Sequence, residues 1–410
     1  MANILYLVHR LPYPPNKGDK VRSYHLLRHL AARHRVFLGT FIDDPDDEVH
    51  LPKLREWCAD VCAVKLQPRA AKLRSLAGLA HGEPLTLHYY DSPRLHDWVR
   101  DTVAAQPIDA AVVFSSSMAQ FAEAVAGLPT LVDLVDVDSA KWTEYAAAHA
   151  WPMSWLYRRE GARLLAYERA VVARSHRSFL VTDKEAALFR QLAPECSGKL
   201  RALCNGVDAH HFTPQAERPS PFAGDEVPLV FTGAMDYWPN IDAVGWFVRE
   251  VLPGLRQRWP ALRFHIVGRS PAPAVTALAN EAVVVSGTVP DVRPYLQHAA
   301  AVGAPLRLAR GVQNKVLEAM AMGRPVVCAS SCIDAIGATA GQCILAADDA
   351  ASYQSQLTHL LAEPGWADAI GDAGQAYVRE GFSWPARLAG LDAVLDAAIA
   401  SRQDTETSPA

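Results

Sequence analysis

Short apolar runs alternate with longer helical patterns from one end of this 410-residue chain to the other. In the first half, the apolar runs cover residues 4–8, 36–40, 110–114, 130–134 and 178–181. These runs are largely apolar on both faces, which is typical of strands in a parallel sheet that helices cover on both sides. Helical periodicity fills the gaps between them, for example over residues 21–34 and 95–105. The alternation predicts the α/β class.

A proline-rich stretch divides the chain into two halves, and the alternation resumes after it with apolar runs at 229–232, 263–267, 283–286, 301–304 and 326–329. A chain of this length is long enough for two domains of ordinary size. We therefore predict a first domain over 1–212, a linker over 213–228, a second domain over 229–383, a final helix over 384–400 and a disordered tail over 401–410. Open α/β sheets bind ligands at the carboxyl ends of their strands, so we expect the site in a cleft between the two domains.

Composition argues against several classes of protein. The formal net charge is −4, which gives no reason to expect nucleic-acid binding. The seven cysteines form no C-x-x-C pair and no cluster with zinc spacing, so we expect reduced thiols and no bound metal. The apolar start of the chain is too short for a signal peptide, and the sequence has no run of about 18 apolar residues. We therefore expect a cytoplasmic protein.

The most informative local pattern is a loop, a helix and a buried strand between residues 308 and 328. Apolar residues recur at helical spacing from Val316 to Ala321, and Gly323 and Pro325 end the helix. The start of such a helix offers unpaired N–H groups to an anion. Glu318 lies further along the same helix, where a carboxylate can accept bonds from ribose hydroxyls. The pattern suits a sugar nucleotide, although an ordinary crossover with a packed helix is the alternative.

Residues 317–327, with the sequence LEAMAMGRPVV, resemble the donor-site motif of the retaining glycosyltransferases of family 4. The resemblance continues at residues 13–20 and 231–236 and extends over nearly the whole chain. It is greatest to the sugar transferases associated with exosortase/PEP-CTERM exopolysaccharide systems. Members of family 4 have the GT-B fold, in which two Rossmann-like domains face each other across a cleft. In that family the final helix crosses back to the first domain.

This resemblance implies a hexosyltransferase-type enzyme that moves a sugar, with retention, from a UDP- or GDP-sugar to a hydroxyl acceptor in exopolysaccharide biosynthesis. The second domain binds the nucleotide and the first binds a glycan or lipid-linked acceptor, and no cofactor is bound. The sequence identifies neither the sugar nor the base. Two other functions stay open at this stage: a sugar-nucleotide epimerase of the same fold, and a non-catalytic partner that binds the sugar nucleotide.

The resemblance also assigns donor-binding residues in the second domain. Gly233 and Gly268 each follow a strand and allow a ligand to approach the backbone closely. Backbone groups around Val289 face the base, and Glu318 holds the ribose. The N–H groups that meet the diphosphate lie at the helix start, which comprises Gly311, Val312, Gln313 and Asn314.

Two stretches of the first domain are further candidates. The loop after the first strand places Gly18 near the donor phosphates, and Asp19 and Lys20 on the acceptor side. The alternative is a plain proline turn with solvated lysines. After another strand, Asp136 and Asp138 stand in an acidic "VDVDS" stretch that the same subgroup carries. We consider Asp136 a catalytic candidate and Asp138 an acceptor-side candidate, with helix capping by Asp138 or Ser139 as the alternative.

The chain also departs from the family pattern. Arg310 stands where family 4 often has a glutamate, eight positions before Glu318. Ala234 and Pro239 stand where an arginine and a lysine usually neutralise the diphosphate. A phosphate leaving group needs positive charge where negative charge develops. We therefore hypothesise that the cations are relocated to Lys315, Arg310 and Arg269, and the alternative is that these are ordinary surface cations.

A segment rich in arginine and aromatic residues extends over residues 151–177. Tryptophan and arginine together are typical of helices that lie on anionic membranes, so a peripheral contact with the inner membrane is one interpretation. The other interpretation is an amphipathic helix packed on its own domain.

Overall fold

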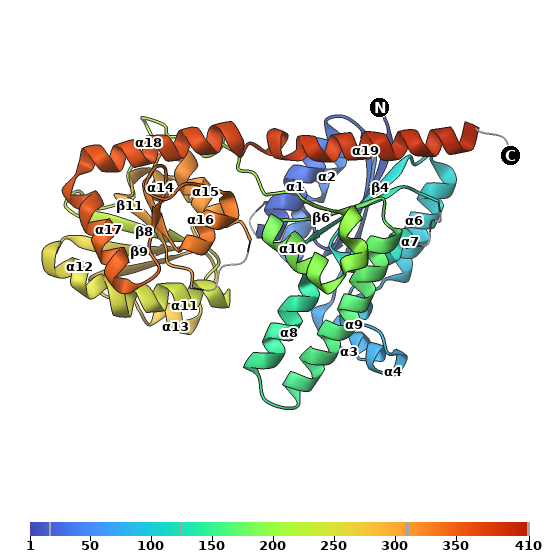
Figure 1. Cartoon of the computed structure of the whole chain (residues 1–410), viewed down its shortest axis with the longest axis horizontal. Coiled ribbons are helices and arrows are strands. Elements are labelled where there is room, and N and C mark those ends of the chain that lie inside the picture. Colours follow the sequence, from blue (N-terminus) through green and yellow to red (C-terminus); the bar gives the residue numbers. More distant parts are fainter. Residues whose placement is uncertain (16–17, 124, 126, 308–310, 408–410) are drawn as a thin grey trace. The chain divides into compact units, whose positions relative to one another are not determined.

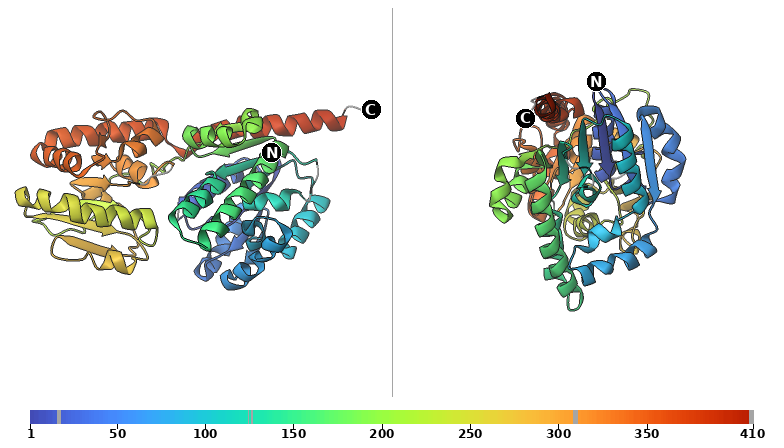
Figure 2. Two further views of the ribbon diagram at one scale, coloured as in Figure 1. Left: turned by 60° about the horizontal axis from the view of Figure 1, so that its bottom comes forward. Right: turned by 90° about the vertical axis from the view of Figure 1, so that its right-hand side faces the viewer.

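The computed structural model describes residues 1–15, 18–123, 125, 127–307 and 311–407. The chain forms two compact units. The first comprises Met1–Cys204 and Leu388–Ala410, and the second comprises Asn205–Arg387 (Figure 1). Each unit is an all-parallel sheet with helices on both faces (Figure 2), which confirms the predicted α/β class.

The first unit contains a seven-stranded sheet in the order β3-β2-β1-β4-β5-β6-β7. Its strands are β1 (Asn3–Val8), β2 (Arg35–Ile42), β3 (Asp60–Lys65), β4 (Ala110–Phe114), β5 (Thr130–Val135), β6 (Arg177–Leu180) and β7 (Leu200–Ala202). Residues 4–8 of β1 are fully buried, because the strand lies mid-sheet and helices cover both of its faces. Chain order reverses between β1 and β4, so their ends at Val8 and Phe114 lie side by side, at the kind of position where open α/β sheets bind ligands.

Helices and short 3-10 turns connect these strands. They are α1 (Gly18–Ala31), η1 (Pro45–His50), α2 (Leu51–Trp57), α3 (Pro68–Ser75), α4 (Ala77–His81), α5 (Leu85–Tyr89), α6 (Pro93–Ala105), η2 (Ser116–Met118), α7 (Ala119–Glu123), α8 (Asp138–Ala148), α9 (Met153–Arg174), α10 (Asp183–Leu192) and η3 (Pro194–Lys199). One buried ion pair joins helix to sheet, since Arg22 of α1 donates from Nε to Asp133 Oδ2 of β5 at 2.7 Å.

The second unit contains a six-stranded sheet in the order β10-β9-β8-β11-β12-β13, with its reversal between β8 and β11. The strands are β8 (Val227–Thr232), β9 (Leu262–Val267), β10 (Val283–Gly287), β11 (Ala301–Ala304), β12 (Val326–Cys328) and β13 (Leu345–Ala346). The helices are α11 (Trp238–Trp246), the π-helical turn η4 (Phe247–Val251), α12 (Leu252–Arg258), α13 (Pro273–Thr276), α14 (Arg293–His298), α15 (Asn314–Ala321), α16 (Ser330–Ile336), α17 (Ala350–Ala362) and α18 (Pro364–Gly381).

The proline-rich stretch 213–228 belongs to the second unit, although we expected it to be a linker. Arg218 within it is buried, and its guanidinium donates to Gln297 Oε1 of α14 at 2.6 Å. The Arg218 carbonyl is bonded to His298 Nε2 at 2.8 Å. These bonds hold the stretch against α14, and the boundary between the units falls earlier, after Cys204.

The last helix, α19 (Trp384–Thr407), begins in the second unit, and its residues from Leu388 onward belong to the first. Asp392 of α19 accepts a bond from His29 Nε2 of α1 at 2.7 Å. Residues 401–407, which we expected to be disordered, continue this helix, because no glycine or proline interrupts the sequence between Gly390 and Thr407. Within the described part of the chain, no helix combines the length and apolar character that crossing a membrane requires.

Candidate functional site

The start of α15 has the geometry of an anion site. Gly311 has a positive φ of 64°, which lets the chain turn into the helix. The Gln313 side chain makes no cap at the helix start and donates instead to the Gly311 carbonyl at 3.4 Å. The first N–H groups of an α-helix lack an acceptor within the helix, so they can bind an external anion. Val312 just before the helix is buried in the core of the unit.

Asn314, the first residue of α15, is bonded within the second unit. Its Oδ1 accepts a hydrogen bond from Asn205 Nδ2 at 3.1 Å. Asn205 lies in the segment that follows β7 in the chain. The bond therefore ties the start of α15 to that segment.

Lys315 lies one residue further and points toward the end of β8. Its Nζ donates to Asn240 Oδ1 of α11 at 2.6 Å and lies 4.1 Å from the centre of the Phe231 ring. A Cβ atom on Gly233 would lie only 3.0 Å from Lys315 Nζ, so the ammonium is close to the backbone at this strand end. Burial lowers the pKa of Lys315 to about 7, and Glu318 counteracts part of that shift.

Glu318 follows Lys315 by three residues and shares its surroundings. Its side chain is half-buried. Burial raises the pKa of Glu318 to about 7, and the Lys315 ammonium opposes part of the rise. A cation and a carboxylate that both titrate near neutrality thus lie within one turn of helix at the start of α15. Perturbed pairs of this kind are common in functional sites.

Gly233 and Gly268 directly follow the neighbouring strands β8 and β9, near Lys315. Gly233 follows β8 with φ 158°, and its N–H donates to the Val267 carbonyl of β9 at 3.0 Å. A Cβ on Gly268 would lie 1.7 Å from the Gly233 carbonyl oxygen. No side chain fits there, so the two loops touch through their backbones.

We expect Gly268→Ala to lower the free energy of unfolding by about 2 kcal/mol or more, because overpacking at this contact must displace one of the loops. Gly303→Ala in β11 is the matched control, since a Cβ there meets no atom within 4 Å. That control is expected to be neutral or slightly stabilising. Urea unfolding of both variants measures the difference, and equal stabilities would contradict the packing argument.

Three further residues were predicted in the second unit: Arg269, Val289 and Arg310. Arg269 is half-buried, and its carbonyl accepts a bond from Met235 N at 2.9 Å. Val289 is half-buried against the core. Arg310 lies outside the described residues. Of the three cations expected near the phosphates, the structure therefore places Lys315 beside Gly233 and Arg269 at the end of β9.

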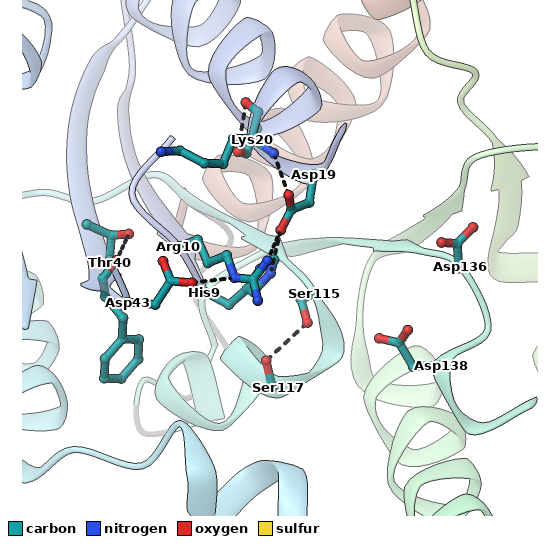
Figure 3. Close-up of polar contacts among 12 residues, drawn as sticks. His9, Arg10, Asp19, Lys20, Thr40, Asp43, Ser115, Ser117, Asp136 and Asp138 are labelled. Carbon is teal, nitrogen blue, oxygen red and sulfur yellow. Dashed lines mark hydrogen bonds and ion pairs between the residues drawn. The ribbon is translucent and has the colours of Figure 1, made fainter. Parts of the chain in front are cut away.

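In the first unit, Asp19 is the centre of a polar cluster at the end of β1. Asp19 Oδ2 accepts a bond from Arg10 NH1 at 2.8 Å and lies 3.4 Å from His9 Nε2 (Figure 3). Arg10 Nε lies 3.0 Å from Asp43 Oδ2 after β2. Although burial opposes it, the contacts with His9 and Arg10 lower the pKa of Asp19 below its usual range. A Cβ on Gly18 would meet no atom within 4 Å, so the space beside α1 is open there.

The structure places Lys20 elsewhere than we expected. Its side chain is 1% exposed, and its Nζ is 2.8 Å from Asp47 Oδ2. Figure 3 shows the Lys20 ammonium pointing away from the Asp19 carboxylate. Lys20 therefore stabilises the fold and does not present a charge beside Asp19.

Asp136 and Asp138 form a second, separate acidic group after β5. Both carboxylates accept from Lys141 Nζ, each at 2.9 Å. Although burial opposes it, Asp138 and Asp136 raise the pKa of Lys141 above its usual range. Both carboxylates lie away from the Asp19 cluster in Figure 3.

Carboxylates from other helices accept the hydrogen bonds of the N–H groups at the start of α8, so the alternative of capping by Asp138 or Ser139 does not hold. Glu185 accepts from Val137 N at 2.9 Å, and Glu168 accepts from Ser139 N at 3.3 Å. Burial, with Asp138 as the next cause, raises the pKa of Glu168 to about 8. Asp136 and Asp138 are thus not occupied as helix caps.

Several residues of these clusters were missed in the sequence. His9 and Arg10 directly follow β1, so the strand-end rule that pointed to Gly18 and Asp19 could have found them. Ser115 follows β4 with φ 77°, a conformation that is uncommon outside glycine and often marks functional loops. Asn240 carried no signal, because its partner Lys315 is 75 residues away in the chain.

Comparison with known proteins agrees with this architecture. Residues 226–363 match the family model described as "Glycosyl transferases group 1". A search of curated proteins finds no match.

Solved structures resemble the chain over nearly its whole length. Sucrose-phosphate synthase from Thermosynechococcus elongatus has a TM-score of 0.73 at 17% identity, covering 98% of this chain and 100% of that one. Anabaena HepE, solved with UDP-glucose, has a TM-score of 0.67 at 14% identity, covering 97% and 100%. WaaG, a glycosyltransferase involved in lipopolysaccharide biosynthesis, has a TM-score of 0.62 at 18% identity, covering 95% and 99%. These likenesses confirm the predicted GT-B fold, and none of them bears on the exosortase-associated subgroup.

Proposed function

Because residues 226–363 match the "Glycosyl transferases group 1" model and the chain has the GT-B fold, we propose that it is a glycosyltransferase that transfers a sugar with retention from a nucleoside-diphosphate sugar to a hydroxyl acceptor. The observation that carries this proposal is the start of α15. There, the Lys315 ammonium lies beside Gly233, and Glu318 follows one turn later on the same helix. Positive charge, the N–H groups of a helix start and a carboxylate at this spacing suit a diphosphate linked to a ribose.

The proposed reaction breaks the bond between the anomeric carbon and the diphosphate oxygen. A new bond forms from that carbon to the acceptor oxygen on the same face, and the acceptor proton leaves with the nucleoside diphosphate. Lys315 and the N–H groups around Gly311, Val312 and Gln313 stabilise the departing charge, and Arg269 and Arg310 add to it. Glu318 positions the nucleotide through the ribose hydroxyls. Positioning and leaving-group stabilisation thus supply most of the rate.

The acceptor is proposed to bind to the first unit. Asp19 and the pair of Asp136 and Asp138 are its candidate contacts, because a carboxylate at a strand end can accept bonds from sugar hydroxyls. A role in exopolysaccharide biosynthesis rests on the resemblance of the "VDVDS" stretch to the exosortase-associated subgroup. UDP-sugars are the first donors to test, since Anabaena HepE was solved with UDP-glucose.

Thermal-shift measurements with a panel of UDP- and GDP-sugars, followed by product analysis with cell extract, test the proposed function. We expect one donor to stabilise the protein and to yield a glycosylated product only when acceptor is present. Conversion of the donor without acceptor would indicate an epimerase. Binding of the donor without turnover in any extract would indicate a non-catalytic partner.

Above pH 7, we expect the protein to take up a proton when it binds a nucleoside diphosphate. In the free protein the pKa of Lys315 is about 7, so at higher pH the amine is mostly neutral. A neighbouring diphosphate favours the ammonium and raises this pKa, so binding and protonation are coupled. Affinity should therefore fall as pH rises above about 7.

Calorimetry in buffers of different ionisation enthalpy measures this uptake. UDP and GDP are the probes, and Lys315→Met is the control variant, in which the uptake should vanish. Below neutrality the sign reverses, because bound ribose favours the ionised form of Glu318, whose free pKa is about 7. Alkaline uptake that persists in Lys315→Met would show that another group titrates.

A further inference from the structure

Exposed apolar side chains gather in one region of the first unit. Among the described residues, twelve large apolar side chains are exposed. Seven of them lie on α3, α4 or α8, on the first turn of α9, or in the connections between these helices. Trp151 is 81% exposed and Leu73 is 76% exposed. The other five are Leu76, Leu79, Tyr145, Met153 and Trp155. Isolated exposed apolar residues are ordinary, but a cluster of this kind marks an interaction site.

Direct bonds hold α4 against the start of α9. The Arg159 guanidinium donates to the carbonyl oxygens of Gly78 at 2.6 Å and Glu83 at 3.1 Å. One residue later, Glu160 accepts from Leu85 N at 2.7 Å. Figure 1 shows α3 and α4 beside α9, whose hairpin with α8 extends from the sheet of this unit. Residues 69–79 and 151–158 therefore belong to one surface, which we call the α3–α9 surface.

Positive charge accompanies these apolar side chains. Residues 67–82 contain Arg69, Lys72 and Arg74 but no acidic residue. Residues 149–159 contain Arg158 and Arg159, again with no acidic residue. Within the described part of the chain, the exposed Arg69, Lys72 and Arg158 form no ion pair.

Few acidic side chains lie nearby. They are Glu83, which is bonded to His88, the exposed Glu144 and the buried Glu160. The charge of this surface is thus positive, opposite in sign to the net charge of −4 of the whole chain.

Packing within the unit accounts for only part of α9. From Glu160 onward one face of α9 is buried, through Leu164, Val171 and Val172. The first turn, with Met153 and Trp155, is exposed, as is Trp151 before it. The interpretation of a packed amphipathic helix therefore holds for α9 from Tyr157, whose ring lies 5.4 Å from that of Trp142 in α8, and does not account for the exposed Trp151, Met153 and Trp155.

We propose that the α3–α9 surface binds a lipid bilayer that contains anionic lipids. Tryptophan and leucine side chains enter the boundary between headgroups and acyl chains, while arginine and lysine contact anionic headgroups. A protein partner is a poorer fit, because lysine is depleted from protein interfaces and the core of such an interface carries few charged residues. The proposal goes beyond sugar transfer and does not depend on it.

Cosedimentation of the full chain with vesicles tests the proposal. We expect binding at low salt to vesicles of phosphatidylcholine mixed with phosphatidylglycerol, little binding to phosphatidylcholine alone, and release at high salt. The double variant Trp151→Ser/Trp155→Ser should partition at least about tenfold less, and Lys72→Glu/Arg158→Glu should do the same. Trp238→Ser is the matched control, because this tryptophan is 58% exposed in the second unit, and it should bind like the parent.

Thermal unfolding and gel filtration of every variant show whether the fold and the oligomeric state are kept. If the unmodified protein (the parent) does not cosediment with anionic vesicles at low salt, the proposal is overturned. An equal loss in Trp238→Ser would also overturn it. A different outcome would assign the surface to a second copy of the chain. In that case the unmodified protein self-associates, the tryptophan variant is monomeric, and neither protein binds vesicles. Failure of these vesicle experiments leaves the donor-binding tests unaffected, so the two proposals are separable.

Discussion

Lys315→Met is expected to reduce sugar transfer by about 10²–10³-fold, the usual effect of removing one group that stabilises developing charge. Affinity for the nucleoside diphosphate should fall by at least about tenfold, because a charge-assisted bond in a desolvated site is lost. Methionine keeps an apolar stem of similar length beside Phe231, so the fold should be retained. Removing a buried cation should even relieve its desolvation. Calorimetric binding of UDP and GDP, together with initial rates, measures both effects.

Two controls separate the phosphate contact from general damage. Uridine and guanosine lack the diphosphate, so their binding should be the same in the parent and in Lys315→Met. Lys184→Met makes the same change at an exposed lysine of α10 and should leave binding and rate unchanged. Loss of nucleoside binding in step with nucleoside-diphosphate binding would argue that Lys315 only supports the local structure.

Glu318→Gln should weaken nucleoside-diphosphate binding by about 10–100-fold, because hydrogen bonds from ribose hydroxyls to a carboxylate are stronger than bonds to an amide. The substitution preserves shape, so the packing of α15 is kept. The effect should be smaller below pH 7, where the carboxyl group of the parent becomes protonated and loses its charge. Titration calorimetry at pH values on both sides of neutrality measures the difference.

Nucleotides that lack the ribose hydroxyls supply the control for Glu318. The 2′,3′-dideoxy forms of UDP and GDP should bind the parent and Glu318→Gln with similar affinities. An equal loss for the ribose and dideoxyribose forms would contradict the assigned contact. It would indicate instead that Glu318 acts on the diphosphate or through the charge of Lys315.

Most of the fold could be predicted from the alternation of apolar runs. Each run that we expected to be a strand overlaps a strand of one of the two parallel sheets, although Val181 and Ala329 fall one residue beyond the ends of β6 and β12. The strands β3, β7 and β13 were missed, and each lies at the edge of its sheet. An edge strand has fewer buried positions, so polar residues interrupt its apolar pattern. In β3, for example, Asp60 and Lys65 are exposed at the two ends.

The candidate site was predictable only where its residues are close in the chain. Lys315 and Glu318 share one helix, so helical spacing placed them together. Gly233 follows β8 and Asn240 lies in α11, so their approach to Lys315 depends on the packing of the unit. Lys20 shows a different error, because it shares the buried face of α1 with Ser23 and Leu27 at helical spacing. That periodicity could have predicted its burial.

The roles of Lys315 and Glu318 both depend on a nucleoside diphosphate that binds at the start of α15. A crystal structure of the protein with a bound nucleoside diphosphate tests this most directly. We expect the diphosphate against the N–H groups around Gly311 and Gln313 with Lys315 beside it, and the Glu318 carboxylate within hydrogen-bonding distance of the ribose hydroxyls. A nucleotide bound elsewhere, or a Glu318 side chain turned into apolar packing in that complex, would contradict the assignment.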